Sequence, residues 1–203
     1  EPELAVAWAF TKDGDELYLV IRGGVVAYDP WNKKTYPVDA TDVLFSLWRA
    51  VRLNLPGGAQ WMIDSFIDVN ASQVLSESEF EQVLSEGLVA VYHGKSVEVV
   101  SMSELLGVFN YAGTTAGVVK LKMKFPYAPI LHILTTGIAS VIPMEYALGD
   151  KYEAALAESN YGKNPSAWAK YVIPGEEDPS YRLLKDKPVS TGPYYVADYR
   201  EGS

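Results

Sequence analysis

The side chains best suited to metal binding are scattered through this sequence. Neither of its two histidines, His93 and His132, has another metal-ligating residue three or four positions away, as a zinc site on a helix requires. The run from Asp13 to Glu16 carries carboxylates, but it lacks the spaced ligands and distal Glu of an EF-hand loop. We therefore predict no metal site, with structural roles for both histidines and a solvated hairpin turn at the acidic run.

Catalytic signatures are also missing. The sequence contains no Gly-rich phosphate-binding loop, no dinucleotide-binding glycine motif, no zinc-protease motif and no Gly-x-Ser-x-Gly nucleophile motif. A glycosidase needs two carboxylates across a cleft, and the 26 Asp and Glu residues do not reveal such a pair without a structure. We predict no catalytic residues and no cofactor, and hence a protein that is not an enzyme.

Composition limits the remaining classes. With 203 residues, 48% hydrophobic and 21% charged, the chain is typical of a globular protein. A formal net charge of −9 argues against nucleic acid as a partner, because phosphate-binding surfaces gather Lys and Arg. The absence of cysteine is compatible with an extracytoplasmic location. The longest apolar stretch, from Tyr127 to Met144, is interrupted by two prolines and His132, so we predict no membrane span.

Residue patterns predict both strands and helices. Leu4 to Phe10 and Leu17 to Arg22 flank a turn and predict a hairpin, with a polar, aromatic loop over 29–36. Asp39 as N-cap and Asp42 three residues later predict a helix with an apolar stripe and with Arg49 and Arg52 on its outer face. Further elements are expected as follows: helices at 60–67, 78–85, 103–109, 126–134, 144–158 with a break near Gly149, and 166–171; strands at 88–92 and 97–100.

The clearest strand runs from Val119 to Lys124. Val119, Leu121 and Met123 alternate with three lysines, so one side is expected to be buried and the lysines exposed. Because strands and helices mix without a regular strand-helix-strand rhythm, we predict an α+β fold with a mixed β-sheet and flanking helices.

Three stretches in order resemble the family 5 extracellular solute-binding proteins, which deliver peptides, nickel complexes or oligosaccharides to ABC importers. The first is LAVAWAFTKDGDELYLVIRGGVVAYDP joined to PVDATDVLFSLWRA, similar to the family's strands and to its Pro-Val-Thr-Ala-x-Asp-Val helix start. Asp39 replaces the family's Thr, and both residues are good N-caps. The second is VVKLKMKFPYAPILHILTTGIASVIPMEYA. The third is PVSTGPYYVADYREGS, with the family's Thr-Gly-Pro-Tyr turn at Thr191 to Tyr194 before a strand.

The resemblance implies part of one lobe of a two-lobed periplasmic-binding-protein-like (type II) fold. We expect a hairpin and loop over about 1–38, an α/β subdomain over 39–158 and a return segment toward the hinge over 159–203, with the second lobe absent. The region between Ala71 and Gly117 is longer than in the common peptide binders. This elaboration is interpreted as an addition to the sheet edge rather than as a specificity element.

The resemblance also implies a function. The expected role is capture of a peptide or oligosaccharide solute outside the membrane and delivery to an ABC permease. The expected location is extracellular or periplasmic, with the full-length protein associated with the membrane. The alternatives are an extracellular hydrolase acting on oligosaccharides or peptides and a surface interaction domain. No family ligand contact transfers to a residue here, so the site prediction is positional: Gln60 and Trp61, in the loop after the Asp39 helix, are expected to face the cleft, with packing of Trp61 as the alternative.

Overall fold

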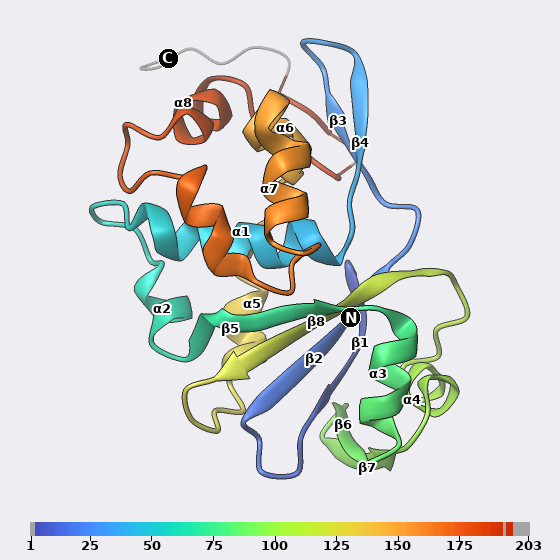
Figure 1. The fold of residues 1–203 in the computed structure, drawn as a ribbon. Coiled ribbons are helices and arrows are strands. Elements are labelled where there is room, and N and C mark those ends of the chain that lie inside the picture. The colour runs from blue at the N-terminus through green and yellow to red at the C-terminus, as the bar shows by residue number, and fades with distance from the viewer. Residues whose placement is uncertain (1–2, 193, 197–203) are drawn as a thin grey trace.

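The computed structural model describes residues 3–192 and 194–196, and it confirms the predicted α+β class (Figure 1). The strands are β1 Ala5–Phe10, β2 Glu16–Arg22, β3 Val26–Asp29, β4 Lys34–Pro37, β5 Ile67–Leu75, β6 Leu88–Tyr92, β7 Lys95–Val99 and β8 Thr115–Met123. The helices are α1 Ala40–Leu53, α2 Trp61–Asp64, α3 Glu77–Leu84, α4 Met102–Val108, α5 Ile130–Leu134, α6 Met144–Leu148, α7 Tyr152–Glu158 and α8 Pro179–Asp186, with 3-10 turns η1 Gly137–Ala139, η2 Gly149–Lys151 and η3 Pro165–Lys170.

Six strands form the main sheet in the order β5-β8-β2-β1-β6-β7. Each neighbouring pair in it is antiparallel, so the expectation of a mixed sheet is wrong in this respect. The physical reason is in the connections: β1–β2 and β6–β7 are hairpins, and the long excursions between the other neighbours return the chain in the opposite direction. β3 and β4 form a separate two-stranded ribbon beside α6, visible at the upper right of Figure 1.

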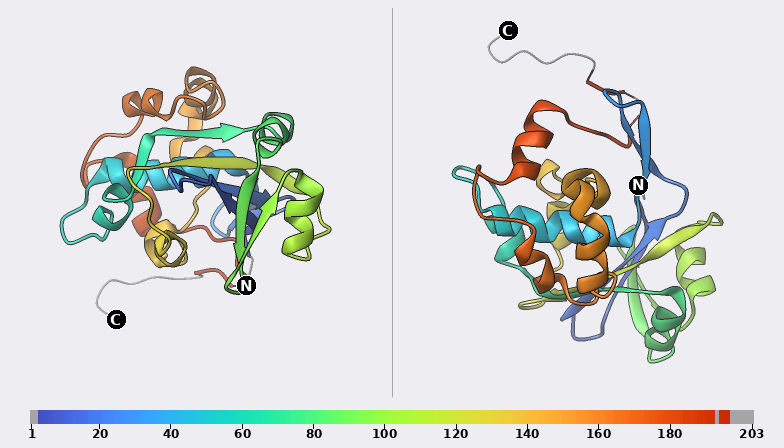
Figure 2. Two further views of the ribbon diagram at one scale, coloured as in Figure 1. Left: turned by 90° about the horizontal axis from the view of Figure 1, so that it is seen from below. Right: turned by 45° about the horizontal axis from the view of Figure 1, so that its top comes forward.

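Both faces of the sheet are covered. Leu17, Leu19 and Ile21 of β2 face the α1 side, whereas Tyr18 and Val20 face the side of α3 and α4. Alternate residues of one strand point to opposite faces, so this strand is buried on both sides. Figure 2 shows α1 and the C-terminal helices gathered on one side of the sheet, with α3 and α4 beside the β6–β7 end.

Helix α1 begins where the sequence predicts. The Asp39 side chain accepts hydrogen bonds from the backbone of Thr41 and Asp42, and the Asp42 carboxylate accepts from the Asp39 backbone, which completes a capping box. The helix ends at Asn54, which adopts the left-handed conformation with φ of 45°. The predicted apolar stripe contacts the sheet, with Leu44 and Leu47 almost completely buried.

Several elements differ from the sequence expectation. The loop expected over 29–36 contains the β3–β4 hairpin, and the helix expected over 60–67 stops at Asp64 because Ile67 begins β5. The helix expected over 126–134 starts only at Ile130, since Pro126 and Pro129 hold the preceding residues in a turn. Helix α8 lies beyond the helix expected at 166–171, in a part of the return segment where the sequence analysis expects no helix. Of the predicted Thr-Gly-Pro-Tyr turn, Pro193 lies outside the described residues, as do residues 197–203, where the strand after the turn is expected to continue.

In strand β8 the predicted buried face is confirmed, but the predicted exposure of the lysines on the other face is only partly correct. Val119, Leu121 and Met123 are at most 3% exposed. Lys120 and Lys122 are only partly exposed, with side-chain exposures of 21% and 35%, because acidic residues at the start of β2 pair with them across the sheet. Lys124 alone of the three is classed as exposed, and it pairs with Asp64 at 3.1 Å. Lys120 and Lys122 therefore form cross-strand ion pairs, whereas the alternation of residues predicts that they face only solvent.

Within the described residues, no helix is long and apolar enough to cross a membrane.

Candidate functional site

Gln60 is the predicted site residue that the structure places in a pocket. It precedes α2, and its side-chain amide donates to the carbonyl of Leu55 at 2.8 Å and to Asn54 Oδ1 at 3.1 Å. These bonds close the loop between α1 and α2 over Gly58, where the Gln60 amide leaves no room for a side chain. Gln60 therefore shapes the loop and the pocket wall together.

Trp61 points elsewhere. Its side chain is 62% exposed, so the alternative that it packs into the fold is wrong, and it is not among the residues that line the pocket at Gln60. The structure thus separates the two residues that the sequence analysis grouped. Adjacent residues at a helix start differ by about 100° around the axis, which explains how one faces the pocket and the other faces solvent.

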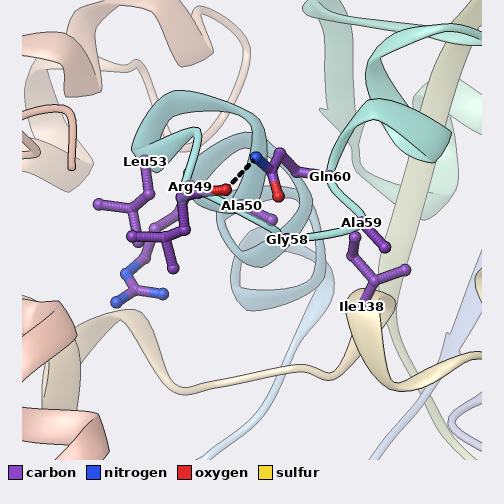
Figure 3. Close-up of a pocket in the computed structure, with 8 residues that line it drawn as sticks. Arg49, Ala50, Leu53, Gly58, Ala59, Gln60 and Ile138 are labelled. Carbon is purple, nitrogen blue, oxygen red and sulfur yellow. Dashed lines mark hydrogen bonds between the residues drawn. The ribbon is translucent and has the colours of Figure 1, made fainter. Parts of the chain in front are cut away.

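The pocket at Gln60 lies between α1, the loop that follows it and η1, and its volume is about 370 Å³ (Figure 3). In Figure 3, Arg49 and Leu53 lie on one side, with Gln60, Ala59 and Ile138 on the other. The lining side chains are mostly apolar, with Arg49 and Gln60 as the polar exceptions; the set is Arg49, Ala50, Leu53, Leu55, Gly58, Ala59, Gln60 and Ile138. An apolar hollow with a few polar groups is the usual form of a small-molecule site.

Arg49 is not on an open outer face as the helix pattern predicts. Its Nε donates to Ser180 Oγ on α8 at 2.7 Å, and its Nη2 atom is buried without a hydrogen-bond acceptor in the described part of the chain. Burial lowers the pKa of Arg49 to about 10, while the negative charge of Asp178 acts in the opposite direction. The residue that contacts Arg49, Ser180, lies 131 positions further along the chain. No local pattern on α1 reveals this contact.

Arg52, the other arginine expected on the outer face, is also in contact with the C-terminal segment. Its Nε donates to the carbonyl of Val172 at 3.1 Å, and the carbonyl of the nearby Leu53 accepts from the Gly175 backbone at 2.8 Å. Residues 172–180 therefore contact the C-terminal half of α1 at Arg49, Arg52 and Leu53. Part of the expected return segment therefore lies beside the pocket.

A second hollow, of about 560 Å³, lies where the starts of α1 and α3 meet β8. Tyr161, 63% exposed, lines it in the left-handed conformation with φ of 55°, which is rare for a bulky residue. The two carboxylates that line this hollow already have partners. Asp39 caps α1, and Glu79 pairs with Lys163 and accepts from the Ser76 backbone. The hollow therefore offers neither carboxylate freely for acid or base chemistry.

The remaining sequence candidates occupy structural positions. His93 lies in the turn between β6 and β7 with φ of 48°, and His132 lies on α5 with its carbonyl bound by Thr135. Asp15 of the acidic run pairs with Lys122, which lowers the pKa of the Asp15 carboxyl to about 2. Among the described residues no group of three or more His, Cys, Asp or Glu side chains is arranged to hold a metal ion.

Comparisons with known proteins find structural likeness at low similarity. No protein-family model matches the chain, and no curated protein matches it significantly. Among solved structures, the chain is similar to the ABC transporter-associated periplasmic binding protein DppA from Helicobacter pylori in complex with the peptide STSA, with a TM-score of 0.45 and 20% sequence identity. The match covers 98% of this chain and 28% of that protein. Similarity at this level assigns neither a family nor a ligand to this chain.

Proposed function

We propose that this chain is part of a solute-binding protein that captures a peptide or similar solute and passes it to an ABC permease. The observation that carries the proposal is spatial: of the three stretches that resemble family 5, the first is hydrogen-bonded to each of the other two in the fold. They are separated along the sequence by long intervening segments. A resemblance confined to local patterns would not require these contacts.

The first and second stretches meet at the start of α1. The Asp42 carboxylate accepts a hydrogen bond from the backbone of Met144 at 2.6 Å, and Ser46 Oγ accepts one from Ile142 at 2.9 Å. Asp42 and Ser46 belong to the helix start of the first stretch, and Ile142 and Met144 flank the proline that ends the apolar segment of the second. Asp42 therefore has a tertiary role besides its part in the capping box, and Ser46 binds the same distant segment.

The first and third stretches meet at the β3–β4 ribbon. The Tyr28 backbone donates to the carbonyl of Ser190 at 2.9 Å, which places the third stretch beside β3 as an additional bridge. The ribbon also packs on α6 through Tyr36 and Tyr146, whose rings are 5.4 Å apart. All three stretches therefore converge around α1, α6 and the ribbon.

In the proposed mechanism this chain supplies one wall of a ligand cleft. Solute binds between two lobes, closure of the lobes buries it, and the closed form docks on the permease. The ligand shifts the equilibrium only by its greater affinity for the closed form. The pocket at Gln60 is the proposed position of the solute on this wall.

The test is to express the open reading frame that contains these residues, purify its product and titrate it calorimetrically with di- to pentapeptides and with cello-oligosaccharides. The proposal expects saturable binding to one of these classes, on the order of micromolar or tighter, as small-molecule capture requires. Absence of binding to every member, in a product shown to be folded by circular dichroism, contradicts the proposal.

A surface interaction domain is the second candidate, and exposed aromatic residues favour it. Phe66 stacks on Tyr127 with 4.0 Å between ring centres and also contacts Phe125, which is 47% exposed. Exposed aromatic clusters are typical of protein interfaces. The hydrolase alternative receives no comparable support, because the carboxylates that line the second hollow, Asp39 and Glu79, are engaged in capping and pairing.

A further inference from the structure

The two edges of the main sheet differ. At the edge formed by β5, the Val74 backbone donates to the carbonyl of Gly162 at 3.1 Å, and η3 packs beside the strand. At the other edge β7 is the last strand of the sheet, and its first four residues are exposed (Figure 1). β7 contains no proline, and its register with β6 has no bulge. Proline and bulges commonly protect open edges from pairing, so β7 lacks two of the usual barriers to an added strand.

The turn of the β6–β7 hairpin determines which backbone groups of β7 point outward. His93 and Gly94 both have positive φ, of 48° and 73°, as in two-residue turns of type I′. The pair that flanks such a turn exchanges both backbone hydrogen bonds, and along the ladder such pairs alternate with pairs that direct N–H and C=O away from each other. Val91 and Ser96 form the first pair of this second kind.

A contact of β6 agrees with this alternation. The carbonyl of Val91 accepts a hydrogen bond from the Trp8 indole of β1 at 2.8 Å, on the side away from β7. The N–H and C=O of Ser96, and those of Glu98 two residues further on, therefore point to the open side of β7. Among the residues that the structure describes, these groups have no hydrogen-bond partner.

The open part of the edge fits one antiparallel register with a copy of itself. The next outward N–H, that of Val100, already donates to the Glu104 carboxylate at 2.9 Å, so the free groups are those of Ser96 and Glu98. Placing Ser96 opposite Glu98 of a second copy satisfies all of them on both strands. A shift by two residues in one direction brings the two Glu98 side chains against each other, and a shift in the other direction places Glu98 against the hairpin turn.

The side chains suit the same register. Val97 lies at its centre and faces Val97 of the second copy, which would cover a side chain that is 39% exposed. The charge of Glu98 is already compensated, since Lys12 Nζ lies 2.6 Å from its carboxylate. Ser96, opposite Glu98 of the second copy, brings a hydroxyl donor to that carboxylate. The strand is therefore complementary to itself in backbone and in side chains.

We propose that two copies of this chain pair through β7 about a two-fold axis at Val97, so that their six-stranded sheets become one continuous sheet. This inference does not depend on the proposed solute capture. The paired strands are short, and the buried area falls below the roughly 1,200 Å² of stable complexes, so the dissociation constant is expected on the order of 100 µM. Each copy carries a net charge of −9, so salt should strengthen the dimer by screening repulsion.

The test is sedimentation equilibrium of the 203-residue chain from about 10 µM to about 1 mM, at low and at high salt. The expected result is an average mass that rises toward that of a dimer as the concentration increases, with a lower dissociation constant at high salt. A monomer at every concentration and at both salt levels overturns the proposal and leaves the edge open to a strand from another protein.

Two substitutions locate the interface. Ser96→Pro removes an outward N–H and places its ring on the open side, while the hydrogen bonds to β6 remain, so dimerisation should weaken about tenfold or more. Val97→Lys opposes two like charges at the two-fold axis and should weaken it as well. Val26→Lys, at a valine of β3 that is 47% exposed, is the matched control and should dimerise like the wild type. Circular dichroism checks folding, and Val97→Lys decides the matter if Ser96→Pro fails to fold.

Cross-linking tests the register, because the chain has no cysteine of its own. Val97→Cys places two thiols opposite each other in a pair with Cα atoms about 4.5 Å apart, close enough for a disulfide. Under mild oxidation it should cross-link about tenfold faster than Ser96→Cys, which faces Glu98 of the second copy, and than the control Val26→Cys. Equal rates in Val97→Cys and Val26→Cys, or a dimer that neither Ser96→Pro nor Val97→Lys weakens, would rule out pairing through β7.

Discussion

At the scale of single residues, Asp42 connects two distant parts of the chain through one carboxylate. It is 7% exposed, and its two oxygens accept from the backbones of Asp39 and Met144. Burial raises the pKa of Asp42 to about 7, and the two backbone hydrogen bonds act against that rise. The protonation state of this residue therefore affects the stability of the contact between α1 and α6.

The first prediction concerns the pH dependence of stability. Because the pKa of Asp42 is raised in the folded state, the native protein binds a proton more tightly than the unfolded chain between about pH 4 and pH 7. Its contribution to stability is complete below about pH 4 and is lost as the pH rises through about 7. The expected loss is on the order of 2 to 4 kcal/mol.

Urea unfolding of the wild type and of Asp42→Asn from about pH 4 to pH 8 measures this dependence. Asparagine does not titrate, so the difference between the two proteins isolates the contribution of residue 42. A wild type that gains stability relative to Asp42→Asn as the pH rises would show that the backbone hydrogen bonds outweigh burial and that the carboxylate is the favoured form.

At the scale of elements, the sequence pattern of a strand shows which of its faces is buried. It does not show which other element packs against that face. The alternation of β8 identifies Val119, Leu121 and Met123 as buried, and the structure confirms it. The pattern does not reveal that Asp15, just before β2, and Glu16 of β2 pair with Lys120 and Lys122 on the other face. Cross-strand neighbours come from register, and register is a tertiary property.

We predict that Met123→Asp unfolds the protein. The side chain is 3% exposed in the core cluster on the α1 side, and burying an unpaired charge there costs several kcal/mol, on the order of the stability of a small domain. Thermal melting followed by circular dichroism is the measurement. Lys122→Gln, on the opposite face of the same strand, is the control and should cost less than about 1 kcal/mol. Equal melting of Met123→Asp and wild type would mean that β8 does not bury this face.

A second prediction at this scale concerns the start of α1. Asp39→Ala removes the side chain that accepts from the backbones of Thr41 and Asp42, so we expect a loss of about 1 kcal/mol. Asp39→Thr retains a capping oxygen and should stay within a few tenths of a kcal/mol of the wild type. Urea unfolding separates the two variants. Equal losses in both would assign the role of Asp39 to its charge rather than to capping.

At the scale of the whole molecule, the pocket at Gln60 depends on segments from three parts of the chain. Helix α1 and the loop after it supply most of the lining, and Ile138 of η1 comes from a segment more distant in sequence. Residues 172–180 cover the adjoining surface of α1. If, as proposed, this pocket is one wall of a two-lobed cleft, it makes only part of the contacts that the closed cleft provides.

On the proposed two-lobed arrangement, we predict that the 203-residue chain binds di- to pentapeptides and cello-oligosaccharides far more weakly than the product of the open reading frame that contains it. A single wall buries only part of the ligand surface while the entropic cost of association remains, so the affinity should fall by several powers of ten. Isothermal titration of both proteins in one buffer makes the comparison. Micromolar or tighter binding by this chain would place the whole site within it and exclude the need for a second lobe.

The absence of catalytic motifs supports a last prediction: the chain hydrolyses neither peptides nor glycosides. The assay uses chromogenic substrates of both classes. Variants at Asp39 and Glu79, the acidic residues that line the second hollow, serve as the check on any turnover. Activity above background that one of these substitutions removes would restore the hydrolase alternative.

The sequence by itself determined those features whose causes are local. The capping box at Asp39, the β1–β2 hairpin, the break at Gly149 and the buried side of β8 each follow from neighbouring residues, and the structure has all of them. A capping oxygen, a turn residue or an alternating face acts over a few positions, so its signal is present in a short window of sequence.

Only the tertiary structure decided the environment of Arg49 and the separation of Gln60 from Trp61. Arg49 has a helix pattern typical of an exposed residue, and it is covered by Ser180, which is 131 positions away. Gln60 turns into the pocket because Asn54 and Leu55 bind its amide, while Trp61 remains 62% exposed. Burial and pairing of a charge depend on which distant segments fold over it, and that information is absent from the local pattern.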